Sequence, residues 1–403
     1  MKLKILQISP QVPVPPVDGG KISIFGLLKA LAERGHSIDF FCYRKHSDYN
    51  YSYNELSKFC NPRIIDVQTD NNVFKAFVNL FKKLPYNVSK FIRPEMWYAI
   101  KEYLKDNNPD IVHIDHIHMS WLIDHLRNVI DKPIVLREHN FESDIIYRYY
   151  LNQRNPISRM YFLKQYQRLL KFETTYAEKF DRVVMISDVD ELKILKFNNN
   201  IKTTIIPAGV DNNLFQIKAY NHNKIPFSLF HIGDLEWKPN LDGLQWFVDE
   251  ILPLIVKNFP KTQLFVYGKN TEKLIIPSEL KKNVVKSGFV LNLWNELLDK
   301  QIGIVPLRIG SGIRIKVLEL LAQGHLVVST EIGKEGIPIV DRKHYLNANK
   351  PETFVEKISN VFKDFNDYKT ICFNAQEFIK QNYAWSNVAE KFESLYVKLI
   401  NNK

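Results

Sequence analysis

The sequence from Ile302 to Gln323 reads IGIVPLRIGSGIRIKVLELLAQ and decides the class of fold. It opens with a short apolar run typical of a buried strand, Ile302–Pro306, passes through a Gly-Ser-Gly turn, and ends in a helical pattern over Ile315–Gln323. Glycines let a ligand approach the backbone, and a helix N-terminus offers free N–H groups and a partial positive charge. The stretch therefore predicts a cradle for a pyrophosphate group.

Charged residues at the start of this helix extend the prediction. Arg314 and Lys316 can form charge-assisted hydrogen bonds to phosphate oxygens. Glu319 follows Lys316 by one helical turn, where a carboxylate can accept hydrogen bonds from vicinal sugar hydroxyls. The stretch is not a P-loop, because it lacks Gly-x4-Gly-Lys-Ser/Thr. A tight turn with a solvated basic helix start is the simpler alternative.

Outward from this stretch, apolar runs alternate with amphipathic helices through both halves of the chain. The other predicted strands are Lys4–Ser9, Ser37–Tyr43, Ile111–Ile114, Pro133–Arg137, Arg182–Ile186, Thr204–Ile206, Phe227–Ile232, Gln263–Tyr267, Val284–Ser287 and Leu326–Ser329. Helical spacing is clearest over Lys21–Arg34, Leu241–Asn258 and Asn382–Ile400. Such alternation predicts an α/β protein with two doubly wound, Rossmann-like domains and a ligand crevice at the carboxyl ends of the strands.

A break in the pattern divides the chain. Residues 211–226 are polar, contain proline and lack periodicity, so we interpret them as a linker. An N-terminal domain is expected over residues 1–210 and a C-terminal domain over 227–381. The amphipathic helix within residues 382–403 is expected to pack back on the N-terminal domain.

The composition limits the classes of partner and compartment. The 403 residues carry a formal net charge of +11, which favours an acidic partner such as a phosphate, a nucleic acid or an anionic membrane surface. Three cysteines lack metal-ligand spacing and are expected to be free thiols in a reducing compartment. No stretch has the apolar length of a signal-peptide core or a membrane span. A cytoplasmic protein, in solution or at the inner face of the membrane, is expected.

Further residues complete the stretch quoted above: Ala322-Gln323-Gly324, Val327-Val328-Ser329-Thr330, Gly333 and Glu335-Gly336. With Ile304 to Glu319 they strongly resemble the donor-binding block of glycosyltransferase family 4 (group 1), whose members are retaining enzymes of the GT-B fold. The resemblance extends over nearly the whole chain, and it implies that the N-terminal domain binds the acceptor and the C-terminal domain binds the nucleotide-sugar. Pro15 to Leu31 is similar to the family's glycine loop and following helix, Ile206 to Asp211 to its interdomain motif, and Phe230 to Gly233 with Trp237 to Asn240 to the opening of its C-terminal domain.

For the donor nucleotide, the resemblance implies residue roles. Glu319 matches the second of two family glutamates and would hold the ribose hydroxyls, whereas the first falls on Ser311, which alters or removes a donor-sugar contact. The segment Gly288-Phe289-Val290 would hold the base.

At two positions that bind the donor diphosphate in many family members, this sequence has a different residue. Asp234 and Pro239 stand where many members have a phosphate-binding Arg and Lys. The phosphate role is therefore expected of Arg314 and Lys316, with Ser311 and Gly312 in the turn. Gly19 and Gly20 would meet the β-phosphate or the reacting sugar across the cleft.

Histidines follow two predicted strands. His113, Asp115, His116 and His118 end one strand, and Glu138 and His139 end the next. In the family, a residue near the first cluster contacts the donor sugar, which points to His116 or Asp115, and His139 with Glu138 would orient the acceptor. The alternative for each histidine is that its ring forms hydrogen bonds with backbone groups of a loop. We expect neither a metal ion nor another cofactor, although His113-x2-His116-x-His118 is a conceivable metal cluster.

Two other patterns have competing interpretations. Asp188-Val189-Asp190 is similar to a metal-binding DxD motif, but Ser187 before it favours a helix cap. Two basic-aromatic stretches, from Phe74 to Arg93 and from Tyr147 to Lys171, suit an anionic lipid surface, with an ordinary solvated face as the alternative. No nucleic-acid recognition motif accompanies them.

The sequence thus predicts a retaining glycosyltransferase that moves a sugar from an NDP-sugar to a hydroxyl of a glycan or lipid-linked acceptor. Bacterial surface polysaccharide or glycolipid synthesis is the expected setting. Two alternatives stay open: a nucleotide-sugar epimerase on the same scaffold, and a non-catalytic sugar-nucleotide-binding protein, which the serine at position 311 would favour.

Overall fold

The computed structural model describes residues 1–16, 18–45, 51–70, 72–310 and 312–402. Within them the chain forms two compact units, Met1–Gly209 with Trp385–Lys403, and Val210–Ala384. The segment 211–226, interpreted above as a linker, lies in the second unit, and the final helix belongs to the first.

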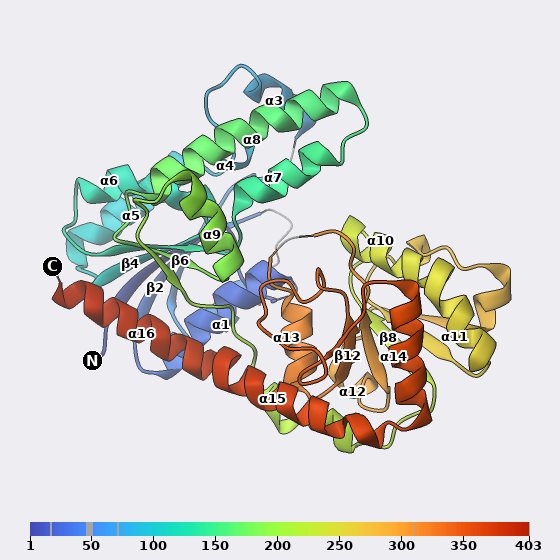
Figure 1. The fold of residues 1–403 in the computed structure, drawn as a ribbon. Coiled ribbons are helices and arrows are strands. Elements are labelled where there is room, and N and C mark those ends of the chain that lie inside the picture. The colour runs from blue at the N-terminus through green and yellow to red at the C-terminus, as the bar shows by residue number, and fades with distance from the viewer. Residues whose placement is uncertain (17, 46–50, 71, 311, 403) are drawn as a thin grey trace. The chain divides into compact units, whose positions relative to one another are not determined.

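The first unit is built on a seven-stranded, wholly parallel sheet in the order β3-β2-β1-β4-β5-β6-β7 (Figure 1). Its strands are β1 (Lys4–Ser9), β2 (Ser37–Arg44), β3 (Asn61–Asp66), β4 (Ile111–Asp115), β5 (Ile134–Glu138), β6 (Arg182–Met185) and β7 (Thr203–Ile205). The order places β1 beside β4, which is a topological switch point where open α/β sheets bind ligands.

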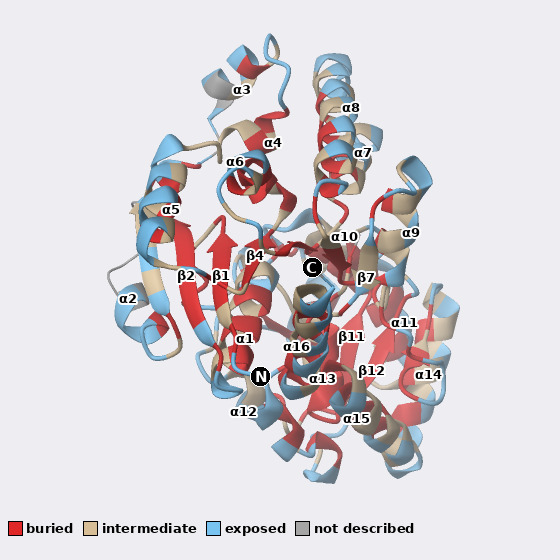
Figure 2. Ribbon diagram, turned by 90° about the vertical axis from the view of Figure 1, so that its left-hand side faces the viewer, coloured by how far each residue is buried: buried red, intermediate tan, exposed pale blue. Residues whose placement is uncertain are grey.

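Helices cover both faces of this sheet. They are α1 (Gly19–Glu33), α2 (Tyr51–Leu56), α3 (Val73–Asn79), α4 (Tyr86–Ser89), α5 (Pro94–Asp106), η1 (Ile117–Leu122), α6 (Ile123–Arg127), α7 (Glu142–Leu151), α8 (Pro156–Ala177), α9 (Asp188–Phe197) and α16 (Trp385–Asn401). Successive strand residues point to opposite faces, so Ile5 joins the core under α1 and α16, and Leu6 joins the core on the other face. Figure 2 shows the strands as the most buried layer.

The second unit has a six-stranded parallel sheet in the order β10-β9-β8-β11-β12-β13. Its strands are β8 (Ser228–Ile232), β9 (Gln263–Tyr267), β10 (Val284–Gly288), β11 (Ile302–Val305), β12 (Leu326–Ser329) and β13 (Leu346–Asn347). Its main helices are α10 (Lys238–Trp246), α11 (Leu252–Asn258), α12 (Leu293–Glu296), α13 (Ile315–Ala322), α14 (Pro351–Lys363) and α15 (Lys369–Tyr383), with a π-helical turn over Phe247–Ile251. The predicted α/β architecture of two doubly wound sheets is confirmed.

Short helical turns and the cysteines complete the description. The 3-10 turns of the second unit are η2 (Asn212–Gln216), η3 (Ala219–Asn221), η5 (Thr271–Lys273), η6 (Ser278–Asn283) and η7 (Asn366–Tyr368). Cys42, Cys60 and Cys372 are buried thiols that form no disulfide, as the sequence predicted. Across the described residues, every helix is too short or too polar to cross a bilayer.

Candidate functional site

In the second unit, Arg314 is fixed against the turn that leads from β11 into α13. It is the N-cap residue of α13, its Nη1 donates to the carbonyl of Gly312 at 2.8 Å, and its guanidinium lies 5.4 Å from the Trp237 ring centroid. A Cβ on Gly310 would come within 2.3 Å of the Arg314 Nη2, at a φ of 136°. The positive φ favours glycine at position 310, and a side chain there would also displace the end of the arginine.

Lys316 connects α13 to the carboxyl end of β8. Its Nζ donates to the carbonyl oxygen of Ile232 at 2.9 Å and to Oδ1 of Asn240 at 2.8 Å. Burial, with the nearby charge of Arg314, lowers the pKa of Lys316 to about 7. Its ammonium therefore lies at the strand end where a ligand of an open α/β sheet would bind.

Glu319 lies one turn further along α13. Burial, with the charge of Asp211, raises the pKa of this carboxyl to about 8. No hydrogen bond from another described residue reaches its oxygens, which leaves both lone-pair sets for a ligand. Ser311, expected beside the phosphates, lies outside the described residues.

The predicted base-binding segment lies on the same edge of the sheet. The N–H of Gly268, after β9, donates to the carbonyl of Gly288 at 2.8 Å, and a Cβ on Gly268 would lie 2.0 Å from the carbonyl oxygen of Gly233, after β8. Gly288 has a φ of 69° and open space around its α-carbon, and the Phe289 side chain is 63% exposed while Val290 is half-buried. The ends of β10, β9 and β8 therefore form one continuous rim that reaches Lys316.

In the first unit, the glycine loop and the histidine cluster meet. Gly19 and Gly20 open α1, and the Asp18 carboxylate caps the helix by accepting from the N–H of Lys21. A Cβ on Gly20 would lie 4.0 Å from Nε2 of His116, which follows β4. Two segments almost a hundred residues apart in sequence thus share one corner of the first unit.

Asp115 is wholly buried, and its carboxylate contacts other side chains of the first unit. Its Oδ2 accepts from Nε2 of Gln7 at 2.7 Å, and its Oδ1 lies 3.2 Å from Nε2 of His139 and 3.3 Å from Nε2 of His113. Burial opposes ionisation of Asp115, but His113 and His139 outweigh it and hold its pKa well below its usual value. The hydrogen bond from His139 requires its proton to be on Nε2.

His116 and His139 are stacked imidazoles, with ring centroids 3.8 Å apart and planes 19° apart. Burial lowers the pKa of both, that of His139 to about 4, so both rings are neutral at pH 7. His116 has a φ of 65°, a strained value for a residue with a Cβ. Its two ring nitrogens are buried and have no hydrogen-bond partner among the described residues.

Buried carboxyls lie beside these histidines, and the sequence singled out only one of them. Glu138 is fully buried and accepts from the N–H of Ile117 at 3.3 Å, and Glu173 accepts from the N–H groups of Glu142 and Ser143. Burial raises the pKa of Glu142 to about 7 and that of Glu173 to about 8. Glu142 begins α7 directly after β5, a position at the ligand-binding sheet edge that could have identified it in the sequence.

The DxD-like sequence is a helix cap, as the Ser187 pattern predicted. The Ser187 hydroxyl accepts from the N–H of Asp190 at 3.1 Å, and it donates to the Asp190 carboxylate at 2.6 Å. Asp190 is buried at the start of α9. Its carboxylate is used in the cap, so it is not offered to a ligand.

Family models match both units of the chain. The model described as Glycosyltransferase Family 4 matches residues 17–214, and the model described as Glycosyl transferases group 1 matches residues 226–364. Together they span most of the chain, which therefore belongs to the group 1 glycosyltransferases of family 4 and is a glycosyltransferase. The sequence prediction of this family is confirmed.

Sequence relatives agree with this assignment and do not define a substrate. The chain is 25% identical over 397 residues, 94% of its length and 96% of the relative's, to an uncharacterized 44.6 kDa protein in the cps region of Klebsiella pneumoniae. It is 22% identical, over 99% of its length and 100% of the relative's, to the uncharacterized glycosyltransferase MJ1069 of Methanocaldococcus jannaschii.

Solved structures share the fold. A sucrose-phosphate synthase from Thermosynechococcus elongatus superposes with a TM-score of 0.72 at 17% identity, over 100% of both chains. Anabaena HepE in complex with UDP superposes with a TM-score of 0.67 at 13% identity, over 99% of this chain and 100% of that one. The GT-B fold class is thereby confirmed, and nothing among these matches supports the epimerase alternative.

Proposed function

We propose that this glycosyltransferase moves a sugar from a nucleoside diphosphate donor to a hydroxyl of a glycan or lipid-linked acceptor, with retention at the anomeric carbon. The observation that carries the proposal is the convergence of Arg314, Lys316 and Glu319 on α13 with the carboxyl ends of β8 to β10. A diphosphate suits the two cations and the helix start, and vicinal ribose hydroxyls suit the Glu319 carboxylate. UDP is the first candidate nucleotide, since HepE was crystallised with it.

The leaving diphosphate is proposed to be neutralised without a metal ion. Arg314, Lys316 and the N-terminus of α13 supply positive charge that is already held in place, so it needs no reorganisation as negative charge develops. His116 and His139 are proposed to contact the sugar and the acceptor, and Asp115 to position His139. Gly20 beside His116 leaves space for a reacting group.

A thermal-shift screen tests the donor half of this proposal. UDP, GDP, ADP, CMP and their common sugar conjugates would each be added to the protein at saturating concentration. A ligand present at a hundred times its Kd stabilises the folded state by about 2.7 kcal/mol. We expect one nucleoside diphosphate to raise the melting temperature, and Glu319→Ala to weaken its binding at least tenfold, about 1.4 kcal/mol. An unaffected Glu319→Ala variant would remove Glu319 from the site.

The acceptor half of the proposal includes contact of the first unit with an anionic membrane. Phe81 at the end of α3 is 83% exposed, and Ile157 and Met160 on α8 are 76% and 68% exposed. Both views place α3 and the α7–α8 hairpin at the same end of this unit (Figures 1 and 2). Arg168 holds them together by donating to the carbonyls of Asn79 and Leu80.

Exposed cations accompany this apolar surface: Lys82, Lys83, Arg154, Arg159, Lys164 and Lys171. Cationic and apolar groups on one helical surface suit an anionic lipid headgroup layer. Such contact fits a lipid-linked acceptor and synthesis of a bacterial surface polysaccharide or glycolipid. A structure of similar fold is a lipopolysaccharide outer core galactosyltransferase.

Vesicle flotation tests the membrane contact. We expect the protein to float with vesicles of phosphatidylglycerol and phosphatidylcholine at low salt, and the double variant Ile157→Ser, Met160→Ser to stay behind. Leu192→Ser is the matched control, because Leu192 on α9 is 69% exposed but lies outside this surface. Wild-type protein that ignores anionic vesicles would refute the membrane contact while leaving the donor assignment intact.

A further inference from the structure

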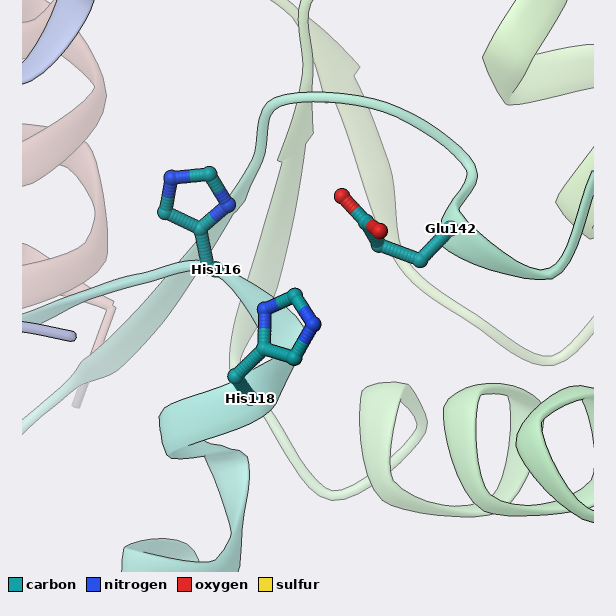
Figure 3. A group of neighbouring side chains, drawn as sticks. All are labelled: His116, His118 and Glu142. Atoms are coloured by element: carbon teal, nitrogen blue, oxygen red, sulfur yellow. The ribbon is translucent and has the colours of Figure 1, made fainter. Parts of the chain in front are cut away.

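We propose that the first unit binds one divalent transition-metal ion, with Zn²⁺ as the best fit, through His116, His118 and Glu142. Each residue offers one ligand atom, and these three atoms lie within 4.8 Å of one another (Figure 3). The side chains come from two elements, since His116 and His118 flank the start of η1 and Glu142 begins α7. The proposed metal site shares His116 with the proposed sugar-contacting residues and lies in a different unit from the proposed diphosphate site.

The ligand set selects a cation and its class. Two neutral imidazoles and a carboxylate present lone pairs, which a metal ion accepts and an anion does not. Imidazole with carboxylate suits zinc and its neighbours, whereas magnesium and calcium prefer oxygen ligands alone. Two histidines and one glutamate are also a known zinc set that keeps a fourth position open for water.

The unsatisfied state of His116 is an independent indication of a missing ligand. Its two ring nitrogens are buried, and no described residue bonds to either of them. A buried polar atom without a partner costs free energy, and in native proteins it marks a catalytic role, strain, a water or an ion. The ring is nevertheless held in place by stacking on His139 and by a strained backbone at a φ of 65°. A metal bound at one nitrogen leaves the other available to a sugar.

Small movements bring the ligands to bonding distance. Ligands about 2.1 Å from a tetrahedral zinc stand about 3.4 Å apart, so the present spacing must close by up to about 1.4 Å. Glu142 is at the first turn of α7, and among the described residues its carboxylate accepts one hydrogen bond, a long one from Asn140 at 3.5 Å. His118 contacts Phe91 and His116 through its ring. Rotation of these two side chains therefore breaks few contacts.

Two carboxyl groups and one lysine lie around the proposed ligands. Glu138 is fully buried, with one oxygen that no described residue bonds, and Glu173 is buried beside α7. Lys90 is the opposing group, because its charge acts on both Glu142 and His118. Replacing it should strengthen metal binding.

Direct metal binding tests the proposal. Protein stripped with EDTA would be titrated with Zn²⁺ by calorimetry and with Co²⁺ by visible absorption, which reports a tetrahedral nitrogen and oxygen site. We expect one ion per chain, a loss of affinity of at least tenfold in Glu142→Gln and in His118→Asn, and a gain in Lys90→Met. His125→Asn is the matched control, since His125 is exposed on α6 and outside the cluster.

The outcomes separate this proposal from the proposed function. No Zn²⁺ binding by the wild type, or equal affinity in Glu142→Gln and the wild type, would overturn the metal site. Weaker binding in Lys90→Met would contradict a cation at this position. Nucleotide-induced thermal shifts, measured on the same samples, report the donor site in the second unit and do not depend on the result.

Discussion

The imidazole of His139 stacks on that of His116 and donates its Nε2–H to the buried carboxylate of Asp115, 3.2 Å away. Asp115 also lies 3.7 Å from the guanidinium of Arg137, which is fully buried and donates to the carbonyl and hydroxyl of Ser23. A charged aspartate thus balances a charged arginine and fixes the histidine pair. Removing that charge has consequences for stability as well as for orientation.

Asp115→Asn is expected to cost about 3–5 kcal/mol of unfolding free energy, because Arg137 becomes an unbalanced buried charge. Chemical denaturation followed by tryptophan fluorescence measures it. Asp124→Asn is the matched control, since Asp124 pairs with Lys179 at the surface and exposed pairs contribute about 0–1 kcal/mol. Equal losses in the two variants would mean that the Asp115 charge has no structural role.

The raised pKa of Glu319 predicts how stability varies with pH. Its pKa is about 8 in the folded chain against an ordinary 4.5, so the folded state holds a proton that the unfolded state releases between these values. The contribution of Glu319 to stability therefore falls as pH rises from about 4.5 to about 8. Glu319→Gln removes this dependence and should melt higher than the wild type at pH 8.

Melting curves between pH 5 and pH 9 check this prediction. Glu356→Gln on α14 is the control, because Glu356 is exposed in the same unit. The difference between Glu319→Gln and wild type should grow up to about pH 8 and then level off, whereas that of the control should stay flat. A difference that is constant across this range would mean that Glu319 is already ionised in the folded chain.

Lys316 should make nucleotide binding depend on pH, because the pKa of this basic group is lowered by burial. Burial lowers its pKa to about 7, and a bound diphosphate favours the charged ammonium. Binding above pH 7 should therefore take up a proton, and affinity for the nucleoside diphosphate should fall by up to about tenfold per pH unit between pH 7 and 9. Lys316→Arg keeps its charge throughout and should show a flat profile.

Calorimetry in two buffers with different ionisation enthalpies counts the protons taken up. About one proton per wild-type chain at pH 8 and none in Lys316→Arg is the expected result. Proton uptake that persists in Lys316→Arg would assign it to another group.

The sequence predicted most strands because buried parallel strands are continuous apolar runs. It missed two edge strands: β3 (Asn61–Asp66), whose residues are half-buried or exposed and include Pro62, and β13 (Leu346–Asn347), which has only two residues. Leu241–Asn258 was predicted as one helix but is interrupted by a π-helical turn, because Pro253 lacks the N–H that a continuous helix would use.

The site was predictable only where its residues are close in sequence. Arg314, Lys316 and Glu319 follow from one stretch, but the Trp237 and Asn240 side chains that hold the first two do not. The contact of His113 with the Tyr396 hydroxyl, 283 positions away at 2.5 Å, is equally non-local. A pattern within one segment of sequence cannot predict contacts between residues that are far apart in the chain.

Gly20 and Gly26 both lie on α1, but the absence of a side chain serves a different purpose at each. At Gly20 it leaves room beside His116 for a reacting group, and at Gly26 it leaves room for the packed indole of Trp385. A Cβ on Gly20 would lie closest to the ends of two flexible side chains, Gln11 at 3.3 Å and Asp18 at 3.4 Å, so Gly20→Ala should fold with wild-type stability. A Cβ on Gly26 would lie 2.1 Å from the Trp385 indole of α16, so Gly26→Ala should lose about 1–3 kcal/mol of unfolding free energy through overpacking.

If the corner beside His116 admits the reacting sugar, Gly20→Ala should lower the transfer rate at least tenfold. Denaturation and donor turnover measured on both variants decide the matter, and a Gly20→Ala variant that turns over donor normally would exclude that corner from the reaction.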